Sequence, residues 1–139
     1  KLKKNLLSPQ AMLASLSVKV LYNLSFNKDA RALMIQHDLI PPLARLYNIF
    51  PNASIVPLLY QISVDMQARK FLSCNEVPRK LVETMKRSPG KILDERLAAL
   101  AINLSTDLRC ADIFCKRGIG FLLKRIKASD DVLIAKVLR

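Results

Sequence analysis

A five-residue pattern recurs three times along the chain, at spacings of 38 and 42 residues. Its copies are Leu21-Tyr22-Asn23-Leu24-Ser25, Leu59-Tyr60-Gln61-Ile62-Ser63 and Ala101-Ile102-Asn103-Leu104-Ser105. Apolar positions downstream keep the same register, in the triplets Met34/Leu72/Phe114, Leu39/Val77/Ile119 and Leu43/Leu81/Leu123. A fixed period of roughly 20 to 50 residues is typical of proteins built from stacked repeats, and it overrides the interpretation of single elements.

Caps and helix-breaking residues divide each unit of the repeat into three helices. Ser8 followed by Pro9 is typical of a helix start, and Asp94 caps a later helix. Ser88-Pro89-Gly90 marks a break. We expect helices over about residues 9–25, 29–37, 41–50, 54–64, 66–74, 78–88, 94–105, 107–116, 119–127 and from 130 onward. No segment alternates apolar and polar residues with a period of two, so we expect no β-sheet.

A short helix followed by two longer ones, the last ending in Leu-x-Asn-Leu-Ser, resembles the armadillo repeat over almost the whole chain. The resemblance implies an all-α fold, a right-handed superhelical solenoid of short-long-long helix triplets. It divides the chain into the third helix of a preceding repeat (1–27), two repeats (28–65 and 66–106) and a repeat cut short at its third helix (107–139). Tetratricopeptide arrays are disfavoured because their period is roughly 34 residues and their units hold two helices. HEAT repeats remain the alternative.

Units of this kind bury their apolar faces only by stacking on neighbours, and the end units need polar caps. The two ends of this chain carry apolar residues instead: Leu13, Leu16 and Val20 near one end, Leu133 and Val137 near the other. We therefore expect the chain to be part of a longer array, and to expose these residues when it is isolated.

The charge balance favours an anionic partner. Lys and Arg number 23 against 11 Asp and Glu, which gives a net charge of +12. The three cysteines are an odd number and no apolar signal segment is present, so free thiols in a reducing, intracellular compartment are expected. The uncharged run from Leu46 to Val64 is long enough for a membrane span. We reject a span because the run contains Asn48, Pro51, Asn52, Pro57 and Gln61.

In armadillo proteins the Asn of the pattern lies on a concave groove and binds the backbone of an extended partner. The resemblance therefore implies a ladder of Asn23, Gln61 and Asn103, in which Gln still offers a donor and an acceptor. The alternative is that these amides satisfy backbone groups inside the stack. Four or seven residues before a ladder position, on the same helix face, stand the basic residues Lys19, Arg96 and, in a fourth copy that begins at the chain end, Lys136.

The nuclear-import adaptors of the armadillo superfamily carry Trp four residues before the ladder position, and this chain has no Trp. Binding of nuclear-import signals is therefore disfavoured. The sparsely basic groove is more similar to that of the catenins, which hold acidic, extended segments.

A narrower resemblance rests on the joint register of these positions from Lys19 to Arg139, and on the Tyr before the first two ladder residues. Together with Leu123-Lys124-Arg125, these positions resemble the kinesin-associated protein family. Members of this family are the non-motor accessory subunit of heterotrimeric kinesin. This implies an adaptor that binds the motor heavy-chain tails and links them to cargo adaptor proteins. The implied location is the cytoplasm, on microtubules, including those of cilia or flagella. Two segments, Cys74–Glu76 and Lys86–Lys91, depart from the resemblance.

The competing class is a basic solenoid that binds nucleic acid or anionic lipid directly. Its candidate surface consists of basic residues on the short or second helices: Arg79, Lys80, Lys86, Arg87, Lys124 and Arg125. Single-stranded nucleic acid needs aromatic stacking platforms in a basic groove, and the groove positions above carry none. A protein partner is therefore favoured, and these basic residues are interpreted as a solvated face.

No arrangement of residues in the sequence indicates catalysis, a metal or a cofactor. His37 and Asp38 are adjacent, so their side chains diverge on a helix. Cys110 and Cys115 with the single His offer too few ligands for zinc. Gly118-Ile119-Gly120 lacks the strand that precedes a phosphate loop and fits a turn between helices. We therefore expect a non-catalytic protein-binding scaffold.

Overall fold

The computed structural model describes residues 1–50, 54–88 and 94–126, and these ranges contain α-helices and no β-strand. The all-α prediction is confirmed for this part of the chain. The helices are α1 (Leu2–Leu6), α2 (Ala11–Leu24), α3 (Lys28–Gln36), α4 (Ile40–Ile49), α5 (Val56–Ser63), α6 (Met66–Ser73), α7 (Val77–Arg87), α8 (Glu95–Ser105), α9 (Leu108–Arg117) and α10 (Ile119–Ile126). None of the described helices combines the length and the hydropathy needed to cross a bilayer.

The helix starts follow from caps and prolines in the sequence. Asn27, Asp65, Asp94 and Asp107 each accept hydrogen bonds from backbone N–H groups of the first turn, with N–O distances between 2.8 and 3.2 Å. Helices α4, α5 and α7 carry Pro in the first turn instead, where no N–H donor is needed. The predicted starts of α2 to α10 therefore lie within two residues of the observed ones.

The first 27 residues hold two helices where one was predicted. Helix α1 precedes α2, and Pro9 lies outside both instead of in a first turn. Ser8 still acts locally, because its hydroxyl accepts a hydrogen bond from the Gln10 N–H at 3.2 Å. Helix α1 packs against both α2 and α4. This short segment is therefore part of the helix packing, a role that its five residues did not reveal in the sequence.

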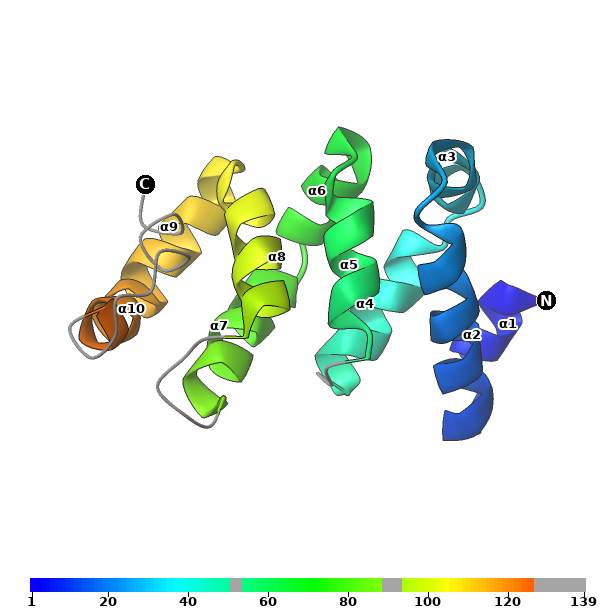
Figure 1. Ribbon diagram of the computed structural model, residues 1–139, viewed down its shortest axis with the longest axis horizontal. Helices are drawn as coiled ribbons and strands as arrows, with labels where there is room; N and C mark the ends of the chain where they lie inside the picture. Colours follow the sequence, from blue (N-terminus) through cyan, green and yellow to red (C-terminus); the bar gives the residue numbers. More distant parts are fainter. Residues whose placement is uncertain (51–53, 89–93, 127–139) are drawn as a thin grey trace.

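The helices form rows along the long axis of the molecule (Figure 1). In one row α5 lies between α2 and α8, and in a second row α4 lies between α1 and α7. Helix α6 packs against α4, α5, α7 and α8, and α9 packs against α7 and α8. The ladder residues stand on α2, α5 and α8, so this row positions the candidate site.

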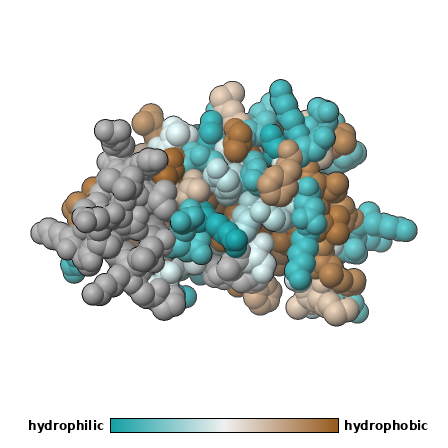
Figure 2. Space-filling view, in the orientation of Figure 1, coloured by the Kyte–Doolittle hydropathy of each residue, from teal (hydrophilic) through white to brown (hydrophobic). Residues whose placement is uncertain are grey.

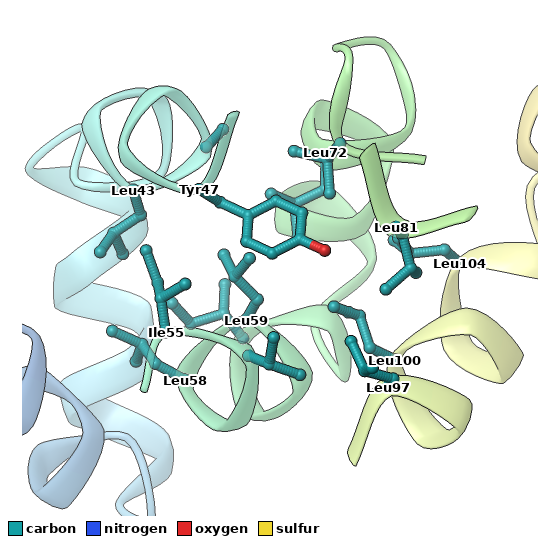
Figure 3. Packing of buried hydrophobic residues seen from close by; sticks show 14 of the residues in the cluster. Leu43, Tyr47, Ile55, Leu58, Leu59, Leu72, Leu81, Leu97, Leu100 and Leu104 are labelled. Atoms are coloured by element: carbon teal, nitrogen blue, oxygen red, sulfur yellow. The ribbon is translucent and has the colours of Figure 1, made fainter. Parts of the chain in front are cut away.

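One hydrophobic cluster joins the rows. Tyr47 is fully buried in it, as Figure 3 shows, among leucines such as Leu59 and Leu81. The Tyr47 hydroxyl donates to Thr84 Oγ1 on α7 at 3.3 Å. Burial raises the pKa of Tyr47 to about 12, although the hydrogen bond to Thr84 acts in the opposite direction. The phenol therefore stays protonated at neutral pH and links α4 to α7.

The predicted register is wrong by one residue in the last unit. Leu43 and Leu81 are fully buried at the predicted spacing, but their expected counterpart Leu123 is 48% exposed and Leu122 is buried instead. Helix α10 begins at Ile119, at the predicted spacing from the start of α7 at Val77, but one residue, Gly118, separates α9 from α10, whereas three residues separate α6 from α7. Glycine suits this tight connection, because a Cβ at Gly118 would lie 2.9 Å from a carbonyl oxygen of α9.

Helix α2 exposes an apolar stripe at the end of the molecule where the chain begins. Its members recur every four residues and are between 46% and 73% exposed: Met12, Leu16, Val20 and Leu24. Figure 2 shows hydrophobic surface gathered over this helix. Residues in the same register on α5 and α8 are buried, at Leu58, Ile62, Leu100 and Leu104. Leu16 and Val20 were predicted to be exposed and are; Leu13 is half-buried, and Leu133 and Val137 lie outside the described residues.

This stripe is expected to make the chain self-associate, because exposed apolar patches of roughly a few hundred Å² drive association. Replacing Leu16 and Val20 together by Glu should shift the chain toward monomer, since burying an unpaired carboxylate is costly. Sedimentation velocity over a concentration series measures the change. Leu33→Glu, at an exposed residue of α3, is the control and should leave association unchanged. A parent chain that is monomeric at every concentration would contradict the prediction.

Candidate functional site

The three ladder residues stand at the same place on neighbouring helices. Asn23 on α2 is exposed, whereas Gln61 on α5 and Asn103 on α8 are half-buried. Two residues after each comes a Ser whose hydroxyl donates to the carbonyl oxygen three residues before it, in the pairs Ser25–Tyr22 (2.6 Å), Ser63–Tyr60 (2.7 Å) and Ser105–Ile102 (2.8 Å). The same helix ending therefore recurs at the spacing of the sequence repeat.

Asn103 makes a hydrogen bond across the boundary between α5 and α8. Its Nδ2 donates to Ser63 Oγ at 3.0 Å, so one half of the amide is engaged inside the stack. This role lies within the stack, like the alternative considered above for the ladder amides, but the partner is a side-chain hydroxyl and not a backbone group. The contact also fixes the plane of the amide, which leaves Oδ1 as an acceptor with a defined direction. A structural role and a binding role are therefore compatible at this residue.

Arginines on the short helices hold the ends of the preceding helices. Each donates from Nη1 to the carbonyl oxygen of the terminal Ser, in the pairs Arg31–Ser25 (2.6 Å) and Arg69–Ser63 (3.3 Å). Arg109 lies two positions early in the register, and its Nη1 donates instead to Cys74 Sγ at 2.7 Å. Hydrogen bonds from a charged donor are stronger than neutral ones. An arginine side chain therefore holds the turns that follow α2 and α5, but none of the described arginine side chains holds the turn after α8 in this way.

Two of the three predicted basic groove residues lie on described helices. Lys19 is exposed one turn before Asn23, and Arg96 is exposed in the first turn of α8. Asp94 and Glu95 neighbour Arg96 in the chain, whereas α2 carries no acidic residue. Lys136 lies outside the described residues. The positive charge of this face is therefore least compensated at Lys19.

The basic residues predicted on the short and second helices, here called the secondary basic surface, are partly neutralised by neighbouring acids. On α7, Arg79 Nη1 lies 3.2 Å from Glu76 Oε1, and Lys80 Nζ lies 3.3 Å from Glu83 Oε2. The side chain of Arg125 is outside the described part of the structure, and exposed members remain at Lys86, Arg87 and Lys124. The two ion pairs reduce the positive charge that this surface presents to a polyanion.

Apolar residues that flank the ladder were missed in the sequence. Phe26 and Val64 each follow a ladder residue by three positions, and they are 60% and 55% exposed. The Phe26 ring packs edge-on against Tyr22, with 5.1 Å between the ring centroids and 66° between the planes. Both residues lie just beyond helix ends, Phe26 in the turn that follows α2 and Val64 directly after the last residue of α5. The sequence reasoning considered only the ladder and the positions before it, so it did not take these residues into account.

All three cysteines are free thiols. Cys110 is fully buried, and burial raises its pKa to about 11. Cys74 and Cys115 are exposed. Within the described ranges there is no group of three side chains suited to hold a metal ion. The amide ladder and its flanking residues are therefore the arrangement from which a function can be argued.

Comparison with models of known protein families gives a match over the whole chain. The model described as kinesin-associated protein (KAP) matches residues 1–139. The match includes all three copies of the five-residue pattern and every helix described above.

Proposed function

This chain belongs to the kinesin-associated protein (KAP) family, and we propose that it is a non-catalytic adaptor that links the heavy-chain tails of heterotrimeric kinesin to cargo. The proposal places it in the cytoplasm on microtubules, including those of cilia. The family itself supports a kinesin-bound protein, and the chemistry of the ladder face supports binding of a protein segment.

We also propose that the helices form armadillo repeats, divided at 28–65, 66–106 and 107–139, with 1–27 belonging to a preceding unit. The row of α2, α5 and α8 supports this division, because these would be the third helices of successive repeats. The identical Ser-to-carbonyl hydrogen bonds at the ends of the three helices support it as well.

One observation carries the binding proposal: three side-by-side helices each present an amide at the same position. In this arrangement an extended segment runs across α2, α5 and α8, and Asn23, Gln61 and Asn103 pair with its backbone. Each residue of an extended segment offers one N–H and one C=O, which must find partners when the segment is bound. An amide offers both a donor and an acceptor, so it can pair with either group.

The positive charge of the chain indicates that the extended partner segment is also acidic. The chain carries a net charge of +12, and Lys19 projects from a helix without acids. Complementary charge steers association and sets register more than it adds affinity. The proposed partner segment is therefore extended and acidic, as in binding by catenins.

Direct binding of nucleic acid or anionic lipid is the second candidate. Its support is the exposed basic residues at Lys86, Arg87 and Lys124. The ion pairs of Arg79 and Lys80 with neighbouring acids reduce that support. Binding of this kind also weakens steeply as salt rises, because it depends on the release of counterions.

The test is a titration of the purified chain against recombinant tail segments of the kinesin heavy chains. Lys19→Glu should weaken tail binding by a few-fold at most, with a larger effect at low salt, because an exposed ion pair contributes only about 0.2 to 1 kcal/mol. The double change of Lys86 and Arg87 to Glu is the control and should leave tail binding unchanged.

Two results would count against the proposal. If the control change abolishes tail binding and Lys19→Glu does not alter it, the partner lies on the secondary basic surface. If neither tail binds while RNA binding persists at high salt, the motor-adaptor assignment is wrong.

A further inference from the structure

Four side chains at the ends of α2 and α5 neighbour the first two ladder residues in the chain, and together they are called the apolar strip. They are Tyr22 and Phe26 around Asn23, and Tyr60 and Val64 around Gln61. Tyr22 and Tyr60 are half-buried against the core, whereas Phe26 and Val64 are more than half exposed. Exposed apolar residues that cluster, unlike scattered ones, are typical of an interaction site.

The exposed members of the strip are held in place. The Phe26 ring packs edge-on against Tyr22. The turn that carries Phe26 is tied by Arg31 to the end of α2, and the turn that carries Val64 is tied by Arg69 to the end of α5. A surface that is already ordered loses little conformational freedom on binding. The strip is therefore already ordered in the free chain, before a partner binds.

The strip ends at the third unit. Thr106 occupies the position of Phe26 and Val64 there, and its hydroxyl donates to the Asn103 carbonyl at 2.8 Å. The arginine that would tie this turn is replaced by Arg109, which bonds to Cys74. The amide position is thus common to all three units, whereas an exposed apolar residue three positions after it is confined to the first two.

We infer that the apolar strip takes one bulky apolar side chain of an extended, acidic segment of a protein partner, whose backbone passes Asn23 and Gln61. This inference rests on the groove binding proposed above and adds its specificity. Side chains of an extended segment alternate in direction, so one can enter the strip while its neighbours face solvent or Lys19. The acidic character follows from Lys19 on an acid-free helix and from the net charge of +12.

A stacked nucleic-acid base is the competing occupant of an exposed aromatic ring. One feature favours the apolar side chain. Val64, the counterpart of Phe26, has no ring on which a base could stack. Burial of apolar surface suits both Phe26 and Val64, whereas stacking suits only one of them.

The experiment selects a random peptide library, displayed on phage, against the purified chain. We expect a consensus with one bulky apolar residue among acidic residues. The selected peptide, labelled with a fluorophore, is then titrated against variants. Phe26→Ala should lower its affinity about ten-fold, since that factor corresponds to about 1.4 kcal/mol and to roughly 60 Å² of buried apolar surface. The loss should be the same at low and high salt.

Matched variants separate burial in the strip from other causes. Phe26→Leu keeps an apolar side chain and should bind within a few-fold of the parent. Thr106→Ala changes the equivalent position of the third unit and should bind like the parent. Because Phe26 and Thr106 are exposed, all three variants should keep the helical circular dichroism of the parent.

Several results would overturn the inference: a consensus without an apolar residue, an equal loss in Thr106→Ala, or selective binding of oligothymidylate in place of peptide. The same variants distinguish this failure from failure of the proposed function. If the kinesin tails bind Phe26→Ala as tightly as the parent, the strip is wrong and the adaptor role stands. If the tails bind no form but the selected peptide is lost in Phe26→Ala, the strip stands and the motor assignment is wrong.

Discussion

Asn103→Leu is expected to weaken binding of the partner segment by about 1 to 3 kcal/mol, which is the cost of leaving a polar group of the complex unpaired. Leucine has the same branched arrangement of side-chain heavy atoms as asparagine but neither donates nor accepts a hydrogen bond. In the structure Asn103 Nδ2 already donates to Ser63 Oγ, so Oδ1 is the atom that we expect the partner to use. Isothermal titration of the kinesin tail against parent and variant measures the loss.

Ser63→Ala provides the control for Asn103→Leu. It removes the partner of Asn103 inside the stack and leaves the amide in place. If the amide acts on the partner segment, Ser63→Ala should bind far more tightly than Asn103→Leu. Equal losses in the two variants would mean that the hydrogen bond between α5 and α8, and not contact with the partner, is what binding requires.

Leu104→Ala is expected to lower the free energy of unfolding by about 2 to 5 kcal/mol, because it leaves a cavity where a buried leucine packed. Leu104 lies on α8, in the row beside α5, and is fully buried. Urea denaturation followed by circular dichroism measures the change.

Leu24→Ala is the matched control, since Leu24 occupies the same register position on α2 and is 46% exposed. Its loss should be near 0.5 kcal/mol, as for other exposed sites. The measurement is made at low protein concentration, so that self-association does not cover the apolar stripe of α2. A loss at Leu24 as large as that at Leu104 would show that another molecule covers the stripe.

The sequence predicted the helices well where the chain supplies local signals. Asp and Asn caps and first-turn prolines mark the starts of α3 to α9, because they act within one turn of the helix. Helix α1 carries no such signal, since its five residues are stabilised by contacts with α2 and α4. The slip from Leu123 to Leu122 was likewise hidden, because α10 begins at the predicted residue and only its packing decides which of its leucines is buried.

For the candidate site, the sequence located the amide positions but not their surroundings. Asn103 was found by its spacing from Asn23, whereas its bond to Ser63 depends on how α5 and α8 pack. Phe26 and Val64 could have been found, since each stands three residues after a ladder position. The ion pair of Arg79 with Glu76 also follows a spacing of three and was visible in advance.

The Tyr47–Thr84 and Asn103–Ser63 hydrogen bonds fasten the same junction from two rows, one joining α4 to α7 and the other α5 to α8. A pull along the long axis passes through the junctions in series, since each unit touches only its neighbours. Every junction then feels the same force, and one fastened on both sides opens later than one held by apolar packing alone. A tether built this way would part at this junction only when both hydrogen bonds and the packing between the rows are lost together.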